Sequence, residues 1–207
     1  SFKTGKQADI EMHGRETLID KAILEQLYDP MTHLVNNAIV HGLEDPETRQ
    51  AGGKPTLGKI VIRAFHQGNQ TVISISDDGA GINTDKVKQS AVNKGLYTQS
   101  EVAQLSDVET FDLLFEAGFS TKSQADELAG RGVGLDVVRT AINDIRGSVH
   151  TDSSIGKGTT FTIRLPLTLS ISKAMFCISD RARIAFPVDG FEDIIEISQA
   201  QVQLNSK

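Results

Sequence analysis

Three glycines separated by single residues, Gly130, Gly132 and Gly134, stand directly before an amphipathic run from Leu135 to Ile145. Glycine permits positive φ angles and lets the backbone approach a ligand closely. The free N–H groups at the start of the following helix favour a bound anion. The pattern predicts either a glycine-hinged loop that closes over a phosphate or an ordinary turn before a helix, and the rest of the chain must decide.

The composition narrows the class of protein. A chain of 207 residues that is 39% hydrophobic can bury one full core and a small additional piece. Its net charge of −6 argues against sequence-independent nucleic-acid binding, which needs a basic surface. No apolar run approaches the ~20 residues of a membrane span, and the start shows no signal-peptide pattern. We expect a soluble, cytoplasmic protein without membrane insertion or nucleic-acid partners, and from the start at Ser1 we expect a fragment.

Five short runs alternate apolar and polar residues, as strands with one buried face do: residues 8–12, 59–64, 71–76, 148–151 and 159–165. The second and third runs are joined by Gln67-Gly-Asn-Gln70, and the last two by the turn at Gly156-Lys-Gly158. Each of these pairs predicts a β-hairpin.

Apolar residues at helical spacing predict helices over residues 84–94, 100–105, 106–115 and 135–145. Ser106 with Glu109 three residues later is a capping box, and Gly147 has the place of a C-cap. A longer helical pattern runs over residues 18–43, where Asp29-Pro30 predicts that one helix ends and a second begins. Residues 44–57 predict a polar loop.

Beyond Pro166 the pattern changes to three short β-like runs, residues 175–178, 184–188 and 194–197. Roughly 35 residues of all-β chain cannot form a core alone. We therefore expect a domain boundary near residues 166–172, followed by the start of a second domain or by an extension packed on the first. The single cysteine, Cys177, lies in an apolar run and is expected to be a buried small hydrophobic residue.

His33, Asn37 and His41 recur at intervals of four on the long helical pattern, which places them on one face of an α-helix. Two histidines eight apart without a nearby Cys or Glu do not make a zinc site. An asparagine oxygen suits Mg²⁺, which shares its ligands with phosphate and water. The alternative is a solvated helix face.

The acidic turn Asp77-Asp-Gly-Ala-Gly81 ends the third alternating run. A carboxylate there can accept a hydrogen bond from an exocyclic amine, while the glycines let a flat ring approach. The alternatives are an ordinary Asp-Gly turn, and a calcium loop, which would need wider acidic spacing and a final Glu.

Two further stretches carry weaker signals. Lys122 precedes the three glycines, and Arg131 lies between Gly130 and Gly132. Both are cations that can pair with phosphate charge. The stretch Gly156-Lys-Gly-Thr-Thr-Phe161 predicts a tight hairpin to which Thr159 can add a polar contact.

The order of these four stretches resembles the GHKL superfamily of ATPases and kinases, and within it the CheA-type chemotaxis histidine kinases. The motifs are HLVNNAIVHGLE, DDGAGI, LLFEAGFSTK, GRGVGLDVV and GKGTTFTIRLPLTL, within residues 8–168. The resemblance implies a two-layer α/β sandwich, the Bergerat ATP-binding fold. It would have a mixed sheet with helices on one face, ATP on the helical side, and a short all-β C-terminal extension.

The resemblance also implies roles for single residues. Asn37 would ligate Mg²⁺, and His33 would be the catalytic residue, at the position where gyrase-type relatives carry a water-activating glutamate. Asp77 would accept the adenine amine, and Lys86 would meet phosphate, with Lys88 as a second candidate. The other nucleotide-binding residues implied are His41, Gly79, Gly81, Ser120, Thr121, Gly130, Gly132, Val133, Gly134, Leu135 and Thr159.

By the same likeness, residues 1–168 would be the catalytic domain of a protein histidine kinase and residues 169–207 the truncated start of an SH3-like, CheW-like regulatory domain. With ATP and Mg²⁺ as cofactors, it would transfer the γ-phosphate to a histidine on a separate phosphotransfer domain. The implied partners are that histidine domain, in trans within a dimer, a CheW-like adaptor with its chemoreceptor, and a downstream response regulator.

Two positions depart from the family pattern. The chain has Asn36 where relatives usually carry Arg, and Val40 where they carry Asp. Phosphoryl transfer depends mainly on positioning and charge neutralisation. These departures therefore motivate a second hypothesis: a catalytically weak nucleotide-binding scaffold that couples through its β extension. A gyrase-type ATP hydrolase is disfavoured, because no Glu lies four residues before Asn37.

Overall fold

The computed structural model describes residues 6–119, 134–167, 174–179 and 182–187. The chain separates into two compact units, Ser1–Leu169 and Ser170–Lys207. In the second unit, β6 (Ala174–Ser179) and β7 (Ala182–Pro187) pair as antiparallel strands. The strand predicted at residues 194–197 and the predicted burial of the Cys177 side chain lie outside the described part of the chain.

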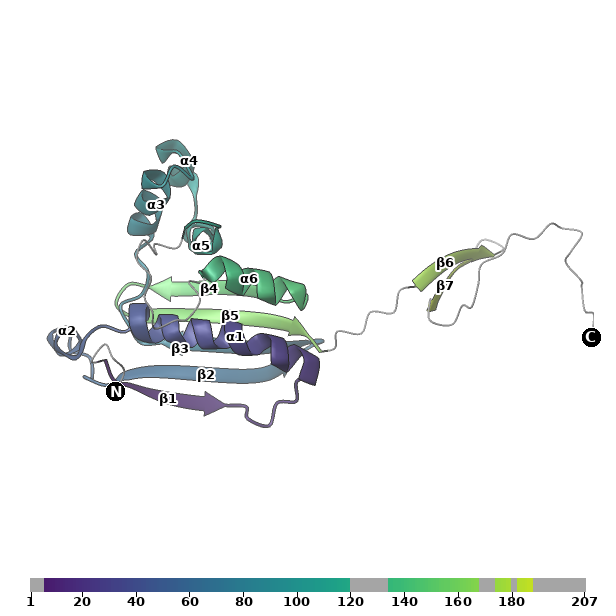
Figure 1. Cartoon of the computed structure of the whole chain (residues 1–207), viewed down its shortest axis with the longest axis horizontal. Helices are drawn as coiled ribbons and strands as arrows, with labels where there is room; N and C mark the ends of the chain where they lie inside the picture. The colour runs from purple at the N-terminus through teal and green to yellow at the C-terminus, as the bar shows by residue number, and fades with distance from the viewer. Residues whose placement is uncertain (1–5, 120–133, 168–173, 180–181, 188–207) are drawn as a thin grey trace, which may run out of the picture. The chain divides into compact units, whose positions relative to one another are not determined.

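The first unit is built on a five-stranded mixed sheet with the order β1-β2-β3-β5-β4 (Figure 1). Its strands are β1 (Ala8–His13), β2 (Gly58–Gln67), β3 (Gln70–Asp77), β4 (Ser148–Ser154) and β5 (Gly158–Pro166). β1 is parallel to β2, and every other pair of neighbours is antiparallel. All five predicted strands and both predicted hairpins are confirmed.

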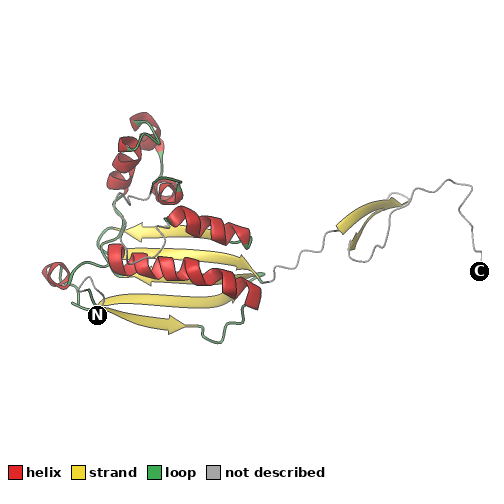
Figure 2. Ribbon diagram, viewed as in Figure 1, coloured by secondary structure: helices red, strands yellow, loops and turns green. Residues whose placement is uncertain are grey.

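Two long helices pack on one face of this sheet (Figures 1 and 2). They are α1 (Lys21–Asn37), which continues into the π-helix η1 (Ala38–Gly42), and α6 (Leu135–Asp144). The other helices are α2 (Pro46–Ala51), α3 (Thr84–Asn93), α4 (Gln99–Gln104), α5 (Asp107–Asp112) and the 3₁₀-helix η2 (Leu113–Phe115). This arrangement confirms the predicted α/β sandwich. The helix α2 corrects the prediction of a loop over residues 44–57.

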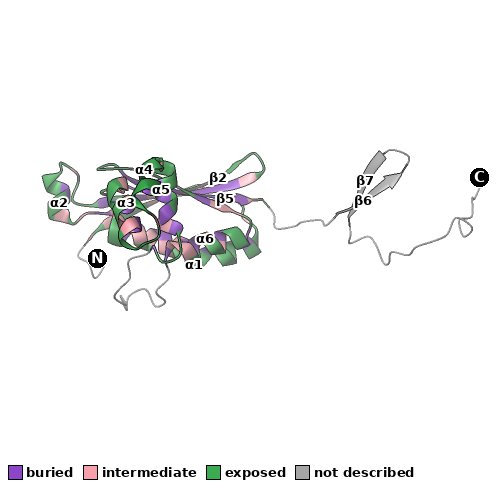
Figure 3. Cartoon of the chain, turned by 90° about the horizontal axis from the view of Figure 1, so that it is seen from above, coloured by how far each residue is buried: buried purple, intermediate pink, exposed green. Residues whose placement is uncertain are grey.

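The main core lies between the sheet and the two long helices, where Figure 3 shows the buried residues. Ile73 and Ile75 on β3 are buried beside their partners Ile163 and Phe161 on β5. α1 contributes one buried stripe, Ile23, Leu27, Pro30 and Leu34. A second, smaller core joins α3, α4 and η2 through Val87, Ala91, Val102, Leu113 and Phe119.

The prediction that the helix breaks at Pro30 is wrong. α1 runs without interruption from Lys21 to Asn37 and begins at Asp20, whose side chain accepts the N–H of Ala22. A proline inside a helix costs about 3 kcal/mol, because it removes one backbone hydrogen bond and crowds the preceding turn. Pro30 is itself buried in the core-facing stripe, so packing of that stripe outweighs the local cost.

The C-terminus of α6 is capped one residue earlier than predicted. Arg146 has the left-handed conformation, with φ 57°, so it takes the place that the sequence assigned to Gly147. The N–H of Arg146 donates to the Asn143 carbonyl at 2.7 Å, and that of Gly147 donates to the Ile142 carbonyl at 2.9 Å. Gly147 is required for space instead, since a Cβ there would lie 2.8 Å from the Arg164 carbonyl oxygen.

The capping box at the start of α5 is confirmed: Ser106 and Glu109 exchange side-chain and backbone hydrogen bonds. α4 begins with a second capping box, formed by Thr98 and Glu101. Among the described residues, no helix combines the length and the apolar character that a membrane crossing requires.

Candidate functional site

The site forms where three segments distant in the sequence meet: η1, the turn after β3, and the β4–β5 hairpin. The Ala80 N–H donates to the Gly42 carbonyl at 2.8 Å, and the Gly156 N–H donates to the Ala80 carbonyl at 2.7 Å. The Ile82 N–H donates to Ser153 Oγ at 2.8 Å. The turn after β3 is therefore held on one side by η1 and on the other by the hairpin.

Asp77, the last residue of β3, is a buried carboxylate. Its Oδ1 accepts the N–H of Gly79 at 2.9 Å and the N–H of Thr159 at 3.3 Å. Burial raises the pKa of Asp77 above its ordinary value, although the two backbone hydrogen bonds act in the opposite direction. Gly42 lies against the face of the carboxyl group, since a Cβ built on it would be 3.0 Å from Oδ2 and 3.1 Å from both Cγ and Oδ1.

The glycines around Asp77 are required by the fold itself. A Cβ on Gly79 would lie 2.0 Å from the Gly42 carbonyl oxygen, and one on Gly158 would lie 1.9 Å from the Asp77 carbonyl oxygen. Gly81 has a φ of +72°, and a Cβ there would lie 2.2 Å from the Ser154 carbonyl oxygen. Close backbone packing thus explains these glycines, whether or not a ligand also approaches them.

His33 and Asn37 are half-buried and lie one turn apart on α1, as their spacing predicts. His41 is exposed and lies in η1, where the Leu43 N–H donates to the Ala38 carbonyl five residues earlier. The prediction of one shared face holds for His33 and Asn37 on α1. For His41, which lies in η1, it stays a prediction. Short π segments are frequent at functional sites.

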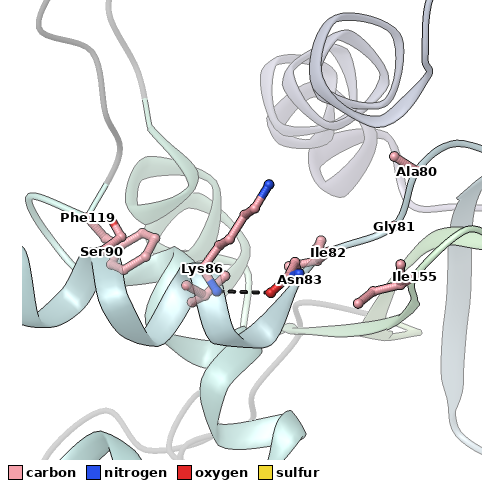
Figure 4. A pocket seen from close by; sticks show the side chains of 9 residues that line it. Ala80, Gly81, Ile82, Asn83, Lys86, Ser90, Phe119 and Ile155 are labelled. Carbon is pink, nitrogen blue, oxygen red and sulfur yellow. Dashed lines mark hydrogen bonds between the residues drawn. The ribbon is translucent and has the colours of Figure 1, made fainter. Parts of the chain in front are cut away.

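A cavity of about 450 Å³ opens beside the turn after β3 (Figure 4). Lys86, in the first turn of α3, projects its side chain into this space (Figure 4). Asn83 caps α3 by accepting the Lys86 N–H at 3.0 Å. Lys88 is directed elsewhere, because its Nζ donates to the Leu105 carbonyl at 2.7 Å. The complete lining is Ala80, Gly81, Ile82, Asn83, Lys86, Val87, Ser90, Phe119 and Ile155.

The remaining predicted site residues fall into four groups. Gly81 and Lys86 line the cavity, whereas Asp77, Gly79 and Thr159 form the buried cluster at the other end of the turn. Gly134 is the N-cap of α6 in an extended conformation, and Leu135 packs against the main core. Outside the described residues are Ser120, Thr121, Lys122, Gly130, Arg131, Gly132 and Val133.

Sequence reasoning missed a group of charged side chains that contact the turn after Asp77. Arg49, on α2, is 1% exposed and forms ion pairs with Glu44 at 3.1 Å and Asp78 at 2.8 Å. Lys54 pairs with Glu44 at 2.8 Å. The available signal was Asp45-Pro46, an N-cap followed by proline at the first helical position, which predicts a helix that would carry Arg49.

The sequence matches the family described as histidine kinase-, DNA gyrase B-, and HSP90-like ATPase over residues 23–169, more than half of the chain. The chain belongs to this family. The matched region contains α1 from Ile23 onward, the turn after β3, the cavity beside α3 and the start of α6, so every described residue of the site lies within it.

Several curated proteins resemble nearly the whole chain. The chemotaxis protein CheA of Listeria monocytogenes is 44% identical over 199 residues, 96% of this chain and 32% of that protein. The CheA of Bacillus subtilis is 39% identical over 95% of this chain and 29% of its own length. The sensor histidine kinase CheAY of Helicobacter pylori is 38% identical over 98% of this chain and 25% of its own length. The chain therefore spans about a third or less of these relatives.

Two solved structures also resemble the chain. The blue-light activated histidine kinase of Erythrobacter litoralis EL346 matches 79% of this chain and 36% of its own, with a TM-score of 0.45 and 15% identity. Its histidine kinase domain matches 76% of this chain and 54% of its own, with a TM-score of 0.44 and 13% identity.

Proposed function

We propose that this chain is the ATP-binding catalytic domain of a CheA-like histidine kinase, which passes the γ-phosphate of ATP to a histidine on a separate phosphotransfer domain. The observation that supports this most directly is the buried Asp77 carboxylate, held by two backbone N–H groups beside a cavity that contains Lys86. Similarity to CheA proteins over nearly the whole chain supports the same function.

The nucleotide would lie along the turn after β3. Asp77 would accept a hydrogen bond from the adenine amine, with Thr159 beside it at the base end. Lys86 would meet phosphate from within the cavity. Gly79 and Gly81 would keep the turn close to η1 and the hairpin. His41, Gly134, Leu135 and the loop residues Ser120, Thr121, Gly130, Gly132 and Val133 remain proposed nucleotide contacts.

Asn37 would ligate Mg²⁺, and the residues present fit such an ion. Within the described part of the chain, no three His, Cys, Asp or Glu side chains are grouped to hold a metal by themselves. Mg²⁺ usually needs only one or two protein oxygens, because water and substrate phosphates complete its shell. When bound, the ion would neutralise phosphate charge. His33, one turn before Asn37 on the same face, would be the catalytic residue that faces the transferred group.

Replacing Asn37 by aspartate is expected to impair Mg²⁺-dependent phosphotransfer at least about tenfold and to change metal-free ADP affinity less than about threefold. The reason is that Asn37 is proposed to contact the ion and not the base. Phosphotransfer rates and calorimetry without Mg²⁺ measure the two effects separately. Asn143→Asp, an exposed change on α6, is the matched control. Equal loss of both quantities in the Asn37 variant would contradict the metal role.

The decisive test of function is incubation of the chain with labelled Mg²⁺-ATP and the histidine domain of its own full-length protein. We expect label on that domain and little free phosphate in its absence. The alternative, a catalytically weak scaffold, is motivated by Asn36 and Val40. Nucleotide binding without measurable transfer would favour the scaffold, whereas transfer at a measurable rate would reject it.

The proposed domain organisation and signalling partners rest on the same similarity to CheA proteins. Residues 1–168 would form the catalytic domain, and residues 169–207 would begin a CheW-like regulatory domain. The phosphate would pass in trans within a dimer and then to a response regulator. A CheW-like adaptor and a chemoreceptor would control the kinase in the cytoplasm.

A further inference from the structure

The segment between η1 and β2, which includes α2, and the turn after β3 together supply a compact set of charges next to Asp77. Arg49, Glu44, Lys54 and Asp78 comprise two cations and two carboxylates joined by ion pairs of 2.8–3.1 Å. Burial alone would raise the pKa of Glu44, but the hydrogen bond from Lys54 and the neighbouring positive charges hold that pKa below its ordinary value. The set is therefore balanced in charge at neutral pH.

Lys54 uses all of its hydrogen-bonding capacity inside this set. Its Nζ donates to Glu44 Oε1 at 2.8 Å, to the Asp78 carbonyl at 2.9 Å and to the Gly79 carbonyl at 2.7 Å. An ammonium group has three N–H donors, and these three acceptors engage them. Lys54 is thus placed to hold the backbone of the turn and has no donor left for a phosphate.

The backbone that Lys54 holds is the one that orients Asp77. The Gly79 N–H donates to Asp77 Oδ1 at 2.9 Å, while the carbonyl of the same residue accepts from Lys54. Asp78 is fixed from both sides, because Arg49 donates to its Oδ2 at 2.8 Å and the Lys59 N–H donates to its Oδ1 at 2.9 Å. A rotation of the Asp78 or Gly79 peptide units would break these bonds and release one support of the Asp77 carboxylate.

We infer that Lys54 is a positioning residue for base recognition: it holds the Asp78–Gly79 backbone so that Asp77 presents its carboxylate to the exocyclic amine of the base. This inference rests on the proposed nucleotide-binding function. Lys54 does not line the ligand cavity. It would nevertheless determine the preference for a base that carries this amine over a base that lacks it.

The test compares ADP with inosine diphosphate, whose base has an oxygen in place of the amine, by calorimetry on the full 207-residue chain. Wild type should prefer ADP. Lys54→Met should lower ADP affinity about tenfold and inosine diphosphate affinity less than about threefold, because only the first uses the oriented carboxylate. Lys59→Met removes an equal charge, which pairs with Glu11, and should leave the preference unchanged.

A thermal unfolding scan of each variant accompanies the titrations. If Lys54→Met does not fold, Lys54→Ala takes its place, because it also removes the donors but leaves room for water at the Asp78 and Gly79 carbonyls, and the same comparison of ADP with inosine diphosphate decides. If the Lys54 variant loses affinity for both nucleotides equally, or keeps the wild-type preference for ADP, the inference is overturned. Binding of ADP by the wild-type chain would still support the proposed function in that case. A wild-type chain that bound neither nucleotide would overturn the proposed function and the inference with it.

Discussion

Replacing Arg49 by methionine is expected to lower the free energy of unfolding by about 3–5 kcal/mol, the usual cost of removing one partner from a buried ion pair. Methionine keeps much of the side-chain volume but offers no donor. Arg49 is 1% exposed and donates to Glu44, to Asp78 and to the Pro55 carbonyl, the last at 2.7 Å. Of these acceptors, the Glu44 carboxylate is 15% exposed and would lose a hydrogen bond in a place that water reaches poorly, whereas the Asp78 side chain is 39% exposed and can be partly solvated.

Urea denaturation of the unliganded chain measures this effect. The control is Arg63→Met, an exposed position on β2, which should change stability by no more than about 0.5 kcal/mol. A loss below about 1 kcal/mol for Arg49→Met would show that water or rearranged side chains satisfy the abandoned acceptors. The charged group would then be a surface feature and not a structural support of the Asp77 turn.

The dipeptide Asp-Pro shows why local signals predicted some helices and not others. Asp-Pro occurs at Asp29-Pro30 and again at Asp45-Pro46, and both fit a helix start. Only the second begins a helix, with Asp45 Oδ1 accepting the Thr48 N–H at 2.9 Å. At Pro30 the buried stripe of α1 continues on both sides, and its packing on the sheet decides. The sequence shows the dipeptide, but the competing packing energy depends on the tertiary structure.

The strands and the capping boxes were predictable because their causes are local. Alternation of apolar residues defines the buried face of β3, and Ser106 with Glu109 satisfies N–H groups within one turn of helix. Asp77 was also predictable, as an acidic residue at the end of a strand. The hydrogen bonds from Lys54 that hold the turn next to Asp77 were not predictable, because Lys54 and Asp78 are 24 positions apart in the sequence.

Replacing Asp77 by asparagine is expected to weaken ADP binding by about 1.5–3 kcal/mol, the value of a hydrogen bond to a charged group. The asparagine oxygen can still accept the N–H groups of Gly79 and Thr159, so the local fold should persist. Calorimetry measures the loss. Asp152→Asn, an exposed change on β4, is the control and should bind as wild type does. An unchanged ADP affinity in the Asp77 variant would remove Asp77 from the nucleotide site.

Asp77→Asn is expected to weaken ADP binding but to raise the free energy of unfolding of the unliganded chain at neutral pH. Burial raises the pKa of Asp77, so the folded chain binds this proton more tightly than the unfolded chain does. Stability contributed by this group is therefore highest at acid pH and falls as the pH rises through the window between the ordinary aspartate pKa and the raised one. Asp77→Asn removes that cost and should stabilise the unliganded chain at pH 7, with the gain vanishing below about pH 4. Denaturation at both pH values tests this. Loss of stability at pH 7 would mean that the buried carboxylate supports the fold, whereas a gain would mean that the chain tolerates an unfavourable buried charge that its ligand requires.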